Sequence, residues 1–100
     1  MLSNNNITLY TSRFCGHSRA VERFMKKNEI AVNQIVIDGN PEARQEVMGI
    51  NNGNASVPTL VFPDGTTLTE PTFRQLRDRL GLKQPGLTKK LRDIFNHDNQ

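Results

Sequence analysis

Cys15 is the only cysteine of the chain, and its neighbours in the sequence favour a reactive thiol. It follows a run of β-branched and aromatic residues at 7–11 and precedes an amphipathic helical pattern that starts at Gly16. The start of a helix carries unpaired backbone N–H groups and the positive end of the dipole, which favour a thiolate. With Arg13 and Arg19 close in sequence, this placement predicts a pKa below that of a free thiol and a nucleophilic role. The alternative is a small buried side chain without chemistry, as most free cysteines are.

The motif Cys15-Gly16-His17-Ser18 has a serine where a C-x-x-C motif has its second cysteine. In C-x-x-C, the second cysteine resolves the mixed disulfide that the first one forms. Serine can hydrogen-bond a thiolate but cannot attack sulfur, so one exchange remains. Cys15 takes a thiol group from a mixed disulfide and must pass it to an external thiol. A single cysteine also excludes an internal disulfide and a zinc finger within one chain.

A second informative segment is Ser56-Val57-Pro58-Thr59, where a proline opens a predicted strand. Proline cannot donate to the ladder, so its presence there needs a special reason. The functional interpretation is a cis-Pro58 whose loop faces Cys15 and presents the backbone of Val57 to an extended thiol ligand. The alternative is an ordinary edge or turn proline, since most X-Pro bonds are trans.

The hydrophobic periodicity predicts an α/β domain with the element order βαβαββα. Strands are expected at 7–11, 32–38, 57–62 and 66–69, and helices at 16–28, 41–49 and 72–81. Asn40 is the expected N-cap of the second helix, Pro41 its first residue, and Gly49 its stop. Thr72 and Gln75 have the spacing of a capping box at the start of the third helix. The run Ile35-Val36-Ile37 is typical of a buried parallel strand.

The chain has 100 residues, 35% of them hydrophobic, and a length that allows one small domain. We expect this domain at 1–82, followed by a linker and an amphipathic helix at 83–100. The helix carries an apolar stripe at Leu87, Leu91, Ile94 and Phe95, which packs back on the domain or docks a partner.

The net charge is +3, and the charge pattern argues against several partners. No basic run is longer than Lys89-Lys90, and no aromatic-rich strand is present to stack bases, so nucleic acid is not an expected partner. No stretch approaches 18 apolar residues, and residues 1–6 lack the apolar region of a signal peptide. We therefore expect a cytoplasmic monomer that does not bind membranes.

Three segments together resemble the glutaredoxin family, and its mycoredoxin-like branch most of all. They are Tyr10-Thr-Ser-Arg-Phe-Cys15-Gly-His-Ser18, Asn51-Asn-Gly-Asn-Ala-Ser-Val-Pro-Thr59 and Phe62-Pro-Asp-Gly-Thr-Thr-Leu-Thr-Glu-Pro71. The resemblance covers residues 7–82, in a monothiol C-G-H-S form. It implies a thioredoxin-like fold, in which helices flank a four-stranded mixed sheet, with a nucleophilic Cys15 and a cis-Pro58.

The resemblance also implies a function, the reduction of mixed disulfides between proteins and a small thiol. The co-substrate would be glutathione, mycothiol or bacillithiol, and the partners S-thiolated proteins. Besides the motif at 15–18, the residues that would bind the thiol ligand are Arg13, Phe14, Ser56, Val57, Pro58, Thr69 and Glu70.

Five positions depart from the family pattern. Ser12 stands where most glutaredoxins carry a lysine that steers the carboxylate of the ligand, a role that Arg13 would take over. Thr69-Glu70 replaces a glycine pair found in many glutathione-binding members. His17 replaces an aromatic residue that lines the ligand groove, and is either a hydrogen-bond donor near the thiolate or an exposed loop residue. Ser18 is either natural or an engineered replacement of a resolving cysteine.

A second function stays open at this point. The form Cys15-Gly-x-Ser18 also resembles monothiol glutaredoxins that carry an iron–sulfur cluster between two protomers. Two Cys15 thiolates and two sulfurs from small thiols would supply the four ligands of a [2Fe–2S] cluster. In this interpretation the cluster needs two chains, and one chain alone does not form a metal site.

Overall fold

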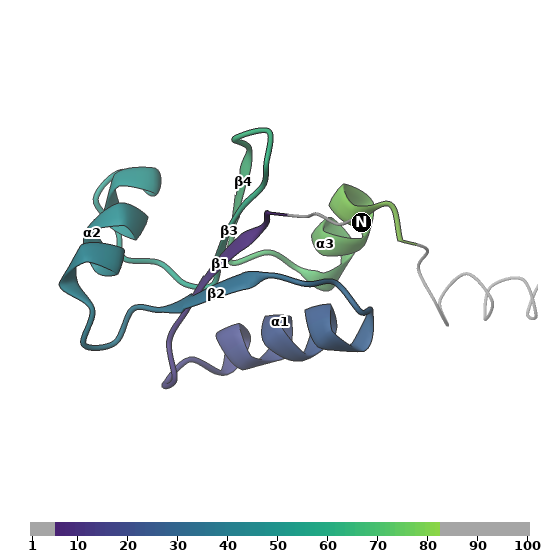
Figure 1. The fold of residues 1–100 in the computed structure, drawn as a ribbon, viewed down its shortest axis with the longest axis horizontal. Helices are drawn as coiled ribbons and strands as arrows, with labels where there is room; N and C mark the ends of the chain where they lie inside the picture. Colours follow the sequence, from purple (N-terminus) through teal and green to yellow (C-terminus); the bar gives the residue numbers. More distant parts are fainter. Residues whose placement is uncertain (1–5, 83–100) are drawn as a thin grey trace, which may run out of the picture.

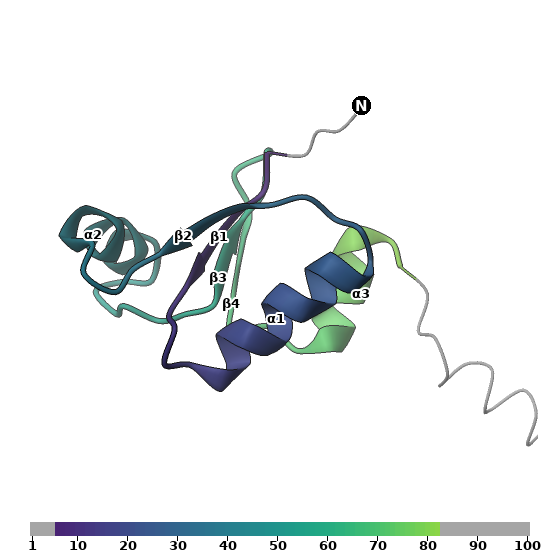
Figure 2. The ribbon, with the colours of Figure 1, turned by 60° about the horizontal axis from the view of Figure 1, so that its bottom comes forward.

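The computed structural model describes residues 6–82, and these form three layers around one sheet (Figure 1). The strands are β1 (Thr8–Thr11), β2 (Asn33–Val36), β3 (Thr59–Val61) and β4 (Thr67–Thr69), and the helices are α1 (Gly16–Lys27), α2 (Pro41–Ile50) and α3 (Phe73–Leu80). The order is the predicted βαβαββα, and all four strands are shorter than predicted. Helix α2 covers one face of the sheet, and α1 and α3 cover the other (Figure 2). The helix predicted within 83–100 lies outside the described residues.

The sheet is mixed, with the strand order β2-β1-β3-β4. β1 pairs with β2 in parallel and with β3 antiparallel, and β3 pairs antiparallel with β4. The expectation of a buried parallel position for residues 35–37 is only partly right, because β2 is an edge strand. Ile37 is buried, whereas Ile35 and Val36 are half-buried. An edge strand has a neighbour on one side only, which leaves part of its surface open to solvent.

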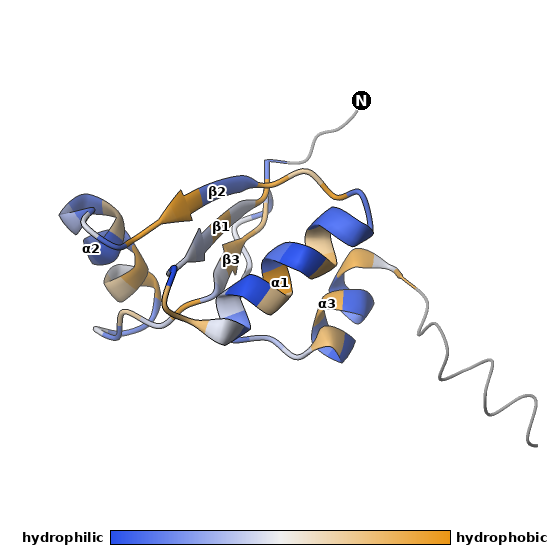
Figure 3. Ribbon diagram, turned by 90° about the horizontal axis from the view of Figure 1, so that it is seen from below, coloured by the Kyte–Doolittle hydropathy of each residue, from blue (hydrophilic) through white to orange (hydrophobic). Residues whose placement is uncertain are grey.

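The sheet separates two hydrophobic clusters, because alternate side chains of a strand point to opposite faces. The larger cluster lies under α1 and α3 and is built on Leu9 of β1 and Leu60 of β3, both without exposed surface. The smaller cluster lies under α2 and includes Tyr10 and Val47. In Figure 3, hydrophobic and hydrophilic residues alternate along α1 at helical spacing, as this one-sided burial requires. Both faces of the sheet are therefore covered by packed side chains. The ends of the strands are left as the place where a functional site can form.

The predicted helix ends are confirmed with one exception. Asn40 caps α2 by accepting a hydrogen bond from the Ala43 N–H (3.2 Å), and the Thr72–Gln75 capping box is formed at α3. Gly81 ends α3 in the left-handed conformation (φ 71°). The prediction that α2 stops at Gly49 is wrong, because the helix extends to Ile50 and Asn51 is its C-cap.

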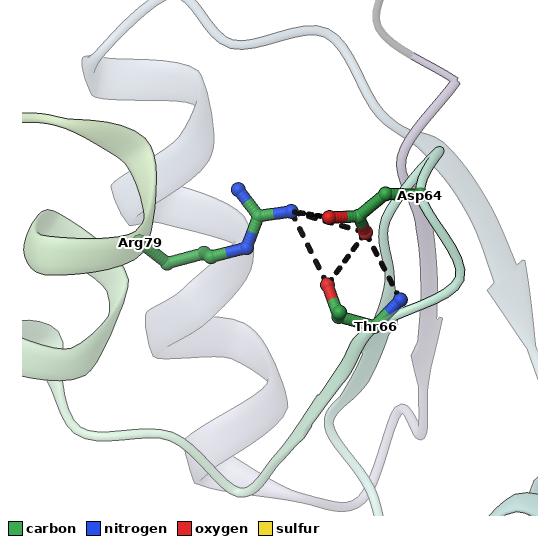
Figure 4. A network of polar contacts seen from close by, with 3 residues as sticks. All are labelled: Asp64, Thr66 and Arg79. Carbon is green, nitrogen blue, oxygen red and sulfur yellow. Dashed lines mark hydrogen bonds and ion pairs between the residues drawn. The ribbon is translucent and has the colours of Figure 1, made fainter.

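The β3–β4 hairpin is attached to α3 by a polar network (Figure 4). Asp64 accepts hydrogen bonds from the backbone N–H (3.0 Å) and the hydroxyl (2.6 Å) of Thr66, and pairs with Arg79 (3.3 Å). The Arg79 guanidinium also lies 3.9 Å from the centroid of the Phe62 ring. These contacts fix the hairpin turn to the helix. No helix within residues 6–82 is long and apolar enough to cross a membrane.

Candidate active site

Cys15 caps the N-terminus of α1, and its sulfur lies between that helix and the loop before β3. Its Sγ accepts a hydrogen bond from the Ser18 backbone N–H (3.4 Å) and donates one to the Val57 carbonyl (3.7 Å). The Val57–Pro58 peptide bond is cis. The structure therefore places the two sequence motifs, 42 residues apart, against each other as predicted. The thiol is partly exposed, as an attacking group must be.

The pKa of Cys15 is lowered, as predicted, but the main cause differs from the predicted one. Burial opposes the thiolate and is the largest single influence. It is outweighed by hydrogen bonds from the backbone and the side chain of Ser18 and from the backbone of His17, all of which favour the charged sulfur. The main contributions thus come from the first turn of α1, and not from Arg13 and Arg19. Glu70 acts in the opposite direction, because its negative charge raises the pKa.

Ser18 does more than replace a second cysteine. It is completely buried, and its hydroxyl oxygen accepts a hydrogen bond from the Ser12 backbone N–H (3.2 Å). Its own backbone N–H binds the sulfur of Cys15. Ser18 therefore joins the end of β1 to the start of α1 and holds the thiol between them.

Asp38 organises the loop that carries Cys15, a role that sequence reasoning missed. Its carboxylate accepts hydrogen bonds from the Arg13 N–H (2.7 Å) and the Ser12 hydroxyl (2.9 Å), and the Ser12 oxygen in turn accepts one from the Phe14 N–H (3.2 Å). The backbone hydrogen bond from Arg13 holds the pKa of Asp38 below its ordinary value. Ser12, at the position of the family's lysine, thus binds an acid of its own chain. The position of Asp38 directly after Ile37, at the end of the second predicted strand, is the feature of the sequence that could have indicated this role.

Substituting Asp38→Asn should release this loop. The Arg13 N–H loses a charge-assisted hydrogen bond, so its amide hydrogen exchange, followed by NMR, should accelerate roughly tenfold. Folding lowers the pKa of Asp38, so the stabilisation that its carboxylate provides is fully present above the pKa of Asp38 in the unfolded state. It is lost as the pH falls through the folded pKa. Protection of the Arg13 amide should follow that titration in the native protein and should not in the variant.

The matched control for this experiment is Asp64→Asn, which removes an equivalent acid from the hairpin network of Figure 4. It should accelerate exchange at Thr66 and leave Arg13 unchanged. An Asp38→Asn protein whose Arg13 amide exchanges at the native rate would contradict the assigned role of this carboxylate.

His17 attaches α1 to the segment before α3 through its side chain. Its ring Nε2 lies 2.8 Å from the Pro71 carbonyl, which can only accept, so Nε2 is the donor of this hydrogen bond. Among the described residues its ring makes no hydrogen bond to the Cys15 sulfur, so the predicted side-chain donor is not observed, and the alternative of an exposed loop residue does not fit its burial. His17 is half-buried, and only its backbone acts on Cys15.

Glu70 lies beside this attachment, in a strained backbone conformation. Its φ of 48° lies in the left-handed region, which favours glycine. The Glu70 N–H binds the carbonyl of Pro58 (2.7 Å), so the backbone of Glu70 contacts the loop that faces the thiol. The side chain is exposed.

Substituting Glu70→Gln should lower the pKa of Cys15 further, since it removes a negative charge that disfavours the thiolate. The pH profile of the alkylation rate of Cys15 should shift to lower pH, with faster alkylation on the acid side. Glu42→Gln, an exposed carboxylate on α2, serves as the control and should leave the profile in place. A Glu70→Gln profile identical to the native one would refute an electrostatic role.

The remaining predicted ligand residues surround the sulfur to different degrees. Phe14 precedes Cys15 and is 88% exposed, the largest apolar exposure among the described residues. A Cβ added at Gly16 would meet no atom within 4 Å, so the surface at this position, directly after Cys15, is open. Arg13 is exposed and contributes its backbone N–H to Asp38. These three positions next to Cys15 in the sequence are therefore exposed at the surface.

Ser56 and Thr69 act within the protein rather than toward open space. The Ser56 carbonyl accepts a hydrogen bond from the Thr59 hydroxyl (2.8 Å), and the Thr69 hydroxyl binds the side chain of Asn51. Asn51 also donates to Thr59 (3.1 Å). This network joins the end of α2 to β3 and β4, and supports the loop that holds Val57 and Pro58. Asn51, which the sequence places only in a loop, is its central member.

Chemically, the site offers one partly exposed thiol with a lowered pKa. Two backbone groups hold the sulfur, and open surface lies beside it. Such a sulfur can attack a disulfide and hold the product as a mixed disulfide. No cluster of three or more potential metal ligands occurs within residues 6–82.

Comparisons with known sequences indicate one family, and a solved structure shares the fold. The family model described as Glutaredoxin matches residues 7–66. A Mycobacterium tuberculosis protein with the provisional name of a glutaredoxin is 35% identical over 74 residues, which span 74% of this chain and 88% of that protein. Mycoredoxin 1 of Corynebacterium glutamicum is 33% identical over 67 residues, which span 67% of this chain and 82% of that protein. The crystal structure of the thioredoxin-like protein BC3987 superposes with a TM-score of 0.64 at 25% identity, covering 73% of this chain and 97% of that one.

Proposed function

Since this chain belongs to the glutaredoxin family of thiol–disulfide oxidoreductases, we propose that it reduces mixed disulfides between proteins and a small thiol by a monothiol mechanism. The observation that carries the proposal is the setting of Cys15. Its sulfur is held by the Ser18 N–H and the Val57 carbonyl, and the chain contains no second sulfur that could resolve a mixed disulfide.

The reaction has two exchanges. In the first, the Cys15 thiolate attacks the small-thiol sulfur of the mixed disulfide; a new S–S bond forms, the old one breaks, and the client protein leaves as a thiolate that takes a proton from water. In the second, the thiolate of another small-thiol molecule attacks the adduct on Cys15. It restores the Cys15 thiolate and releases the oxidised small thiol. The client is reduced, and two small-thiol units are oxidised to one disulfide.

Each group of the site has a part in these steps. The hydrogen bonds from the first turn of α1 favour the Cys15 thiolate both as nucleophile and as leaving group. The Val57 backbone, next to Pro58, offers strand-like pairing to the peptide bonds of the ligand. Exposed Phe14 and Arg13 border the open side of the thiol, where they contact the ligand.

The co-substrate is glutathione, mycothiol or bacillithiol, and the name mycoredoxin of one relative gives mycothiol some support. The protein acts as a monomer on S-thiolated proteins. It works in a reducing compartment such as the cytoplasm, where small thiols stay reduced. No observation on the described residues favours the iron–sulfur alternative, which stays a prediction from the sequence.

Steady-state kinetics test the proposal. One carrier protein is modified in turn with each of the three small thiols, and the release of its thiol is followed at varied concentrations of that small thiol. We expect acceleration with at least one of them and parallel lines in double-reciprocal plots, the pattern of two successive exchanges. Intersecting lines would contradict the free Cys15 adduct, and no acceleration above background with any of the three would refute the proposed function.

A further inference from the structure

A groove on the face of α1 and α3 that lies away from the sheet has no role in the function proposed above. It has a volume of about 450 Å³ and lies between Ala20, Phe24 and Lys27 on one helix and Phe73 and Arg77 on the other. Its floor is aromatic, because the rings of Phe24 and Phe73 stack with their centroids 5.3 Å apart. Phe73 is 42% exposed, so part of its ring is available to a partner. We call this feature the α1–α3 groove.

The charged residues that line the α1–α3 groove all have one sign. Arg23 and Lys27 lie at its α1 side, and the Arg77 guanidinium lies over the aromatic floor, 5.2 Å from the Phe24 ring centroid and 5.9 Å from that of Phe73. No acidic residue lines the groove. Within residues 6–82, none of these three cations takes part in an ion pair, and the pair formed by Arg79 lies at the hairpin instead. The groove therefore suits a partner that is acidic and partly apolar.

The α1–α3 groove shares helix α1 with the reactive thiol. His17, Ala20, Phe24 and Lys27 follow one another along one face of α1 at spacings of three or four residues. In the first turn of α1, His17 contacts Pro71, two residues before α3 begins at Phe73. Cys15 caps the same helix, and eight residues at a rise of about 1.5 Å place Arg23 roughly 12 Å along it. An extended chain covers that distance in about four residues.

We propose that the α1–α3 groove binds an acidic segment of the S-thiolated client, with an aromatic or aliphatic side chain of that segment on Phe73. This inference rests on the proposed function and specifies its substrates: the acidic segment lies about four residues from the modified cysteine. Residues 83–100 of the chain itself fit the groove less well, because they carry four lysines and arginines against two aspartates. Like charges would repel that segment from Arg23, Lys27 and Arg77.

The test uses two peptides of equal length, each with a cysteine in mixed disulfide with the small thiol. One has Glu-Glu-Phe four residues beyond that cysteine and the other Gln-Gln-Phe. The full-length native protein should show a KM for the acidic peptide roughly tenfold below that for the neutral one, with the same kcat. The variant Arg23→Glu/Lys27→Glu should lose this preference, since both side chains are exposed and their reversal leaves the core intact. The control Lys26→Glu/Arg44→Glu makes the same change in net charge outside the groove and should keep the preference.

A binding measurement separates failure of the groove from failure of the catalytic proposal. Fluorescence anisotropy is recorded with labelled peptides that carry serine in place of the modified cysteine, so no exchange is needed. Stronger binding of the acidic peptide, lost in Arg23→Glu/Lys27→Glu but not in the control variant, supports the groove even if no peptide is turned over. Equal binding of both peptides, or equal loss in both variants, overturns it. A dimer in sedimentation that the groove variant alone abolishes would assign the surface to a second copy, and would also overturn it.

Discussion

Replacing Cys15 by serine should abolish disulfide exchange, with a loss on the order of a thousandfold or more in the rate of client reduction. A hydroxyl does not act as a nucleophile toward sulfur, and the variant contains no cysteine that could replace Cys15. The fold should survive, because serine is among the preferred N-cap residues and can accept the Ser18 N–H bond that the sulfur accepts now. Release of the client thiol, followed under the conditions of the native assay, measures the loss.

Circular dichroism and the thermal midpoint provide the control for this substitution. Both should stay close to the native values, which would assign the loss of activity to chemistry rather than to unfolding. Retention of more than a small fraction of the native rate in Cys15→Ser would show that the reaction does not pass through this thiol.

Replacing Ser18 by cysteine should convert the protein into a dithiol oxidoreductase. Positions 15 and 18 are one helical turn apart, a separation that disulfide geometry accepts, and the Ser18 N–H already contacts the Cys15 sulfur. On oxidation the variant should form an intramolecular disulfide, losing two hydrogens in mass and both free thiols. It should also reduce internal disulfides of a protein substrate, because the new cysteine resolves the mixed disulfide. The native chain should do neither.

Glu22→Cys is the matched control, since it also adds one cysteine to α1. Position 22 is about 10 Å along the helix from Cys15, too far for a disulfide bridge. This variant should keep the mass of two free thiols in dilute oxidant. If Ser18→Cys behaved in the same way, the assigned geometry of the first turn would be wrong.

The sequence predicts the fold well because its local signals agree with one another. A β-branched run at 7–11, an amphipathic helix after Gly16 and the turn residues around Asp64 all indicate the elements that the structure contains. Capping residues fix the helix starts, since Asn40 and Thr72 satisfy N–H groups that have no other partner. The stop of α2 escapes this reasoning. Gly49 is compatible with a helix interior at a modest cost, and the helix continues past it.

The site is predicted in its central members and missed in its supporting ones. Cys15 and Pro58 carry recognisable patterns, and their contact across the sheet end follows from the strand order. Asp38 and Asn51 act through hydrogen bonds to residues 25 and 8 positions away, and no local spacing reveals such partners. The charge effect predicted for Arg13 and Arg19 fails for a related reason. Nearness in sequence does not fix where a long exposed side chain lies, whereas the backbone N–H groups of a helix start are fixed.

The mass of the protein after a single exchange tests the central claim most directly. Reduced protein is mixed with an equimolar S-thiolated client in the absence of free small thiol, quenched with acid and analysed intact and after digestion. The account predicts that the protein gains the mass of one small-thiol unit on the peptide containing Cys15, while the client loses the same mass. A protein of unchanged mass beside an unreduced client, or one joined covalently to the whole client, would contradict the proposed attack of Cys15 on the small-thiol sulfur.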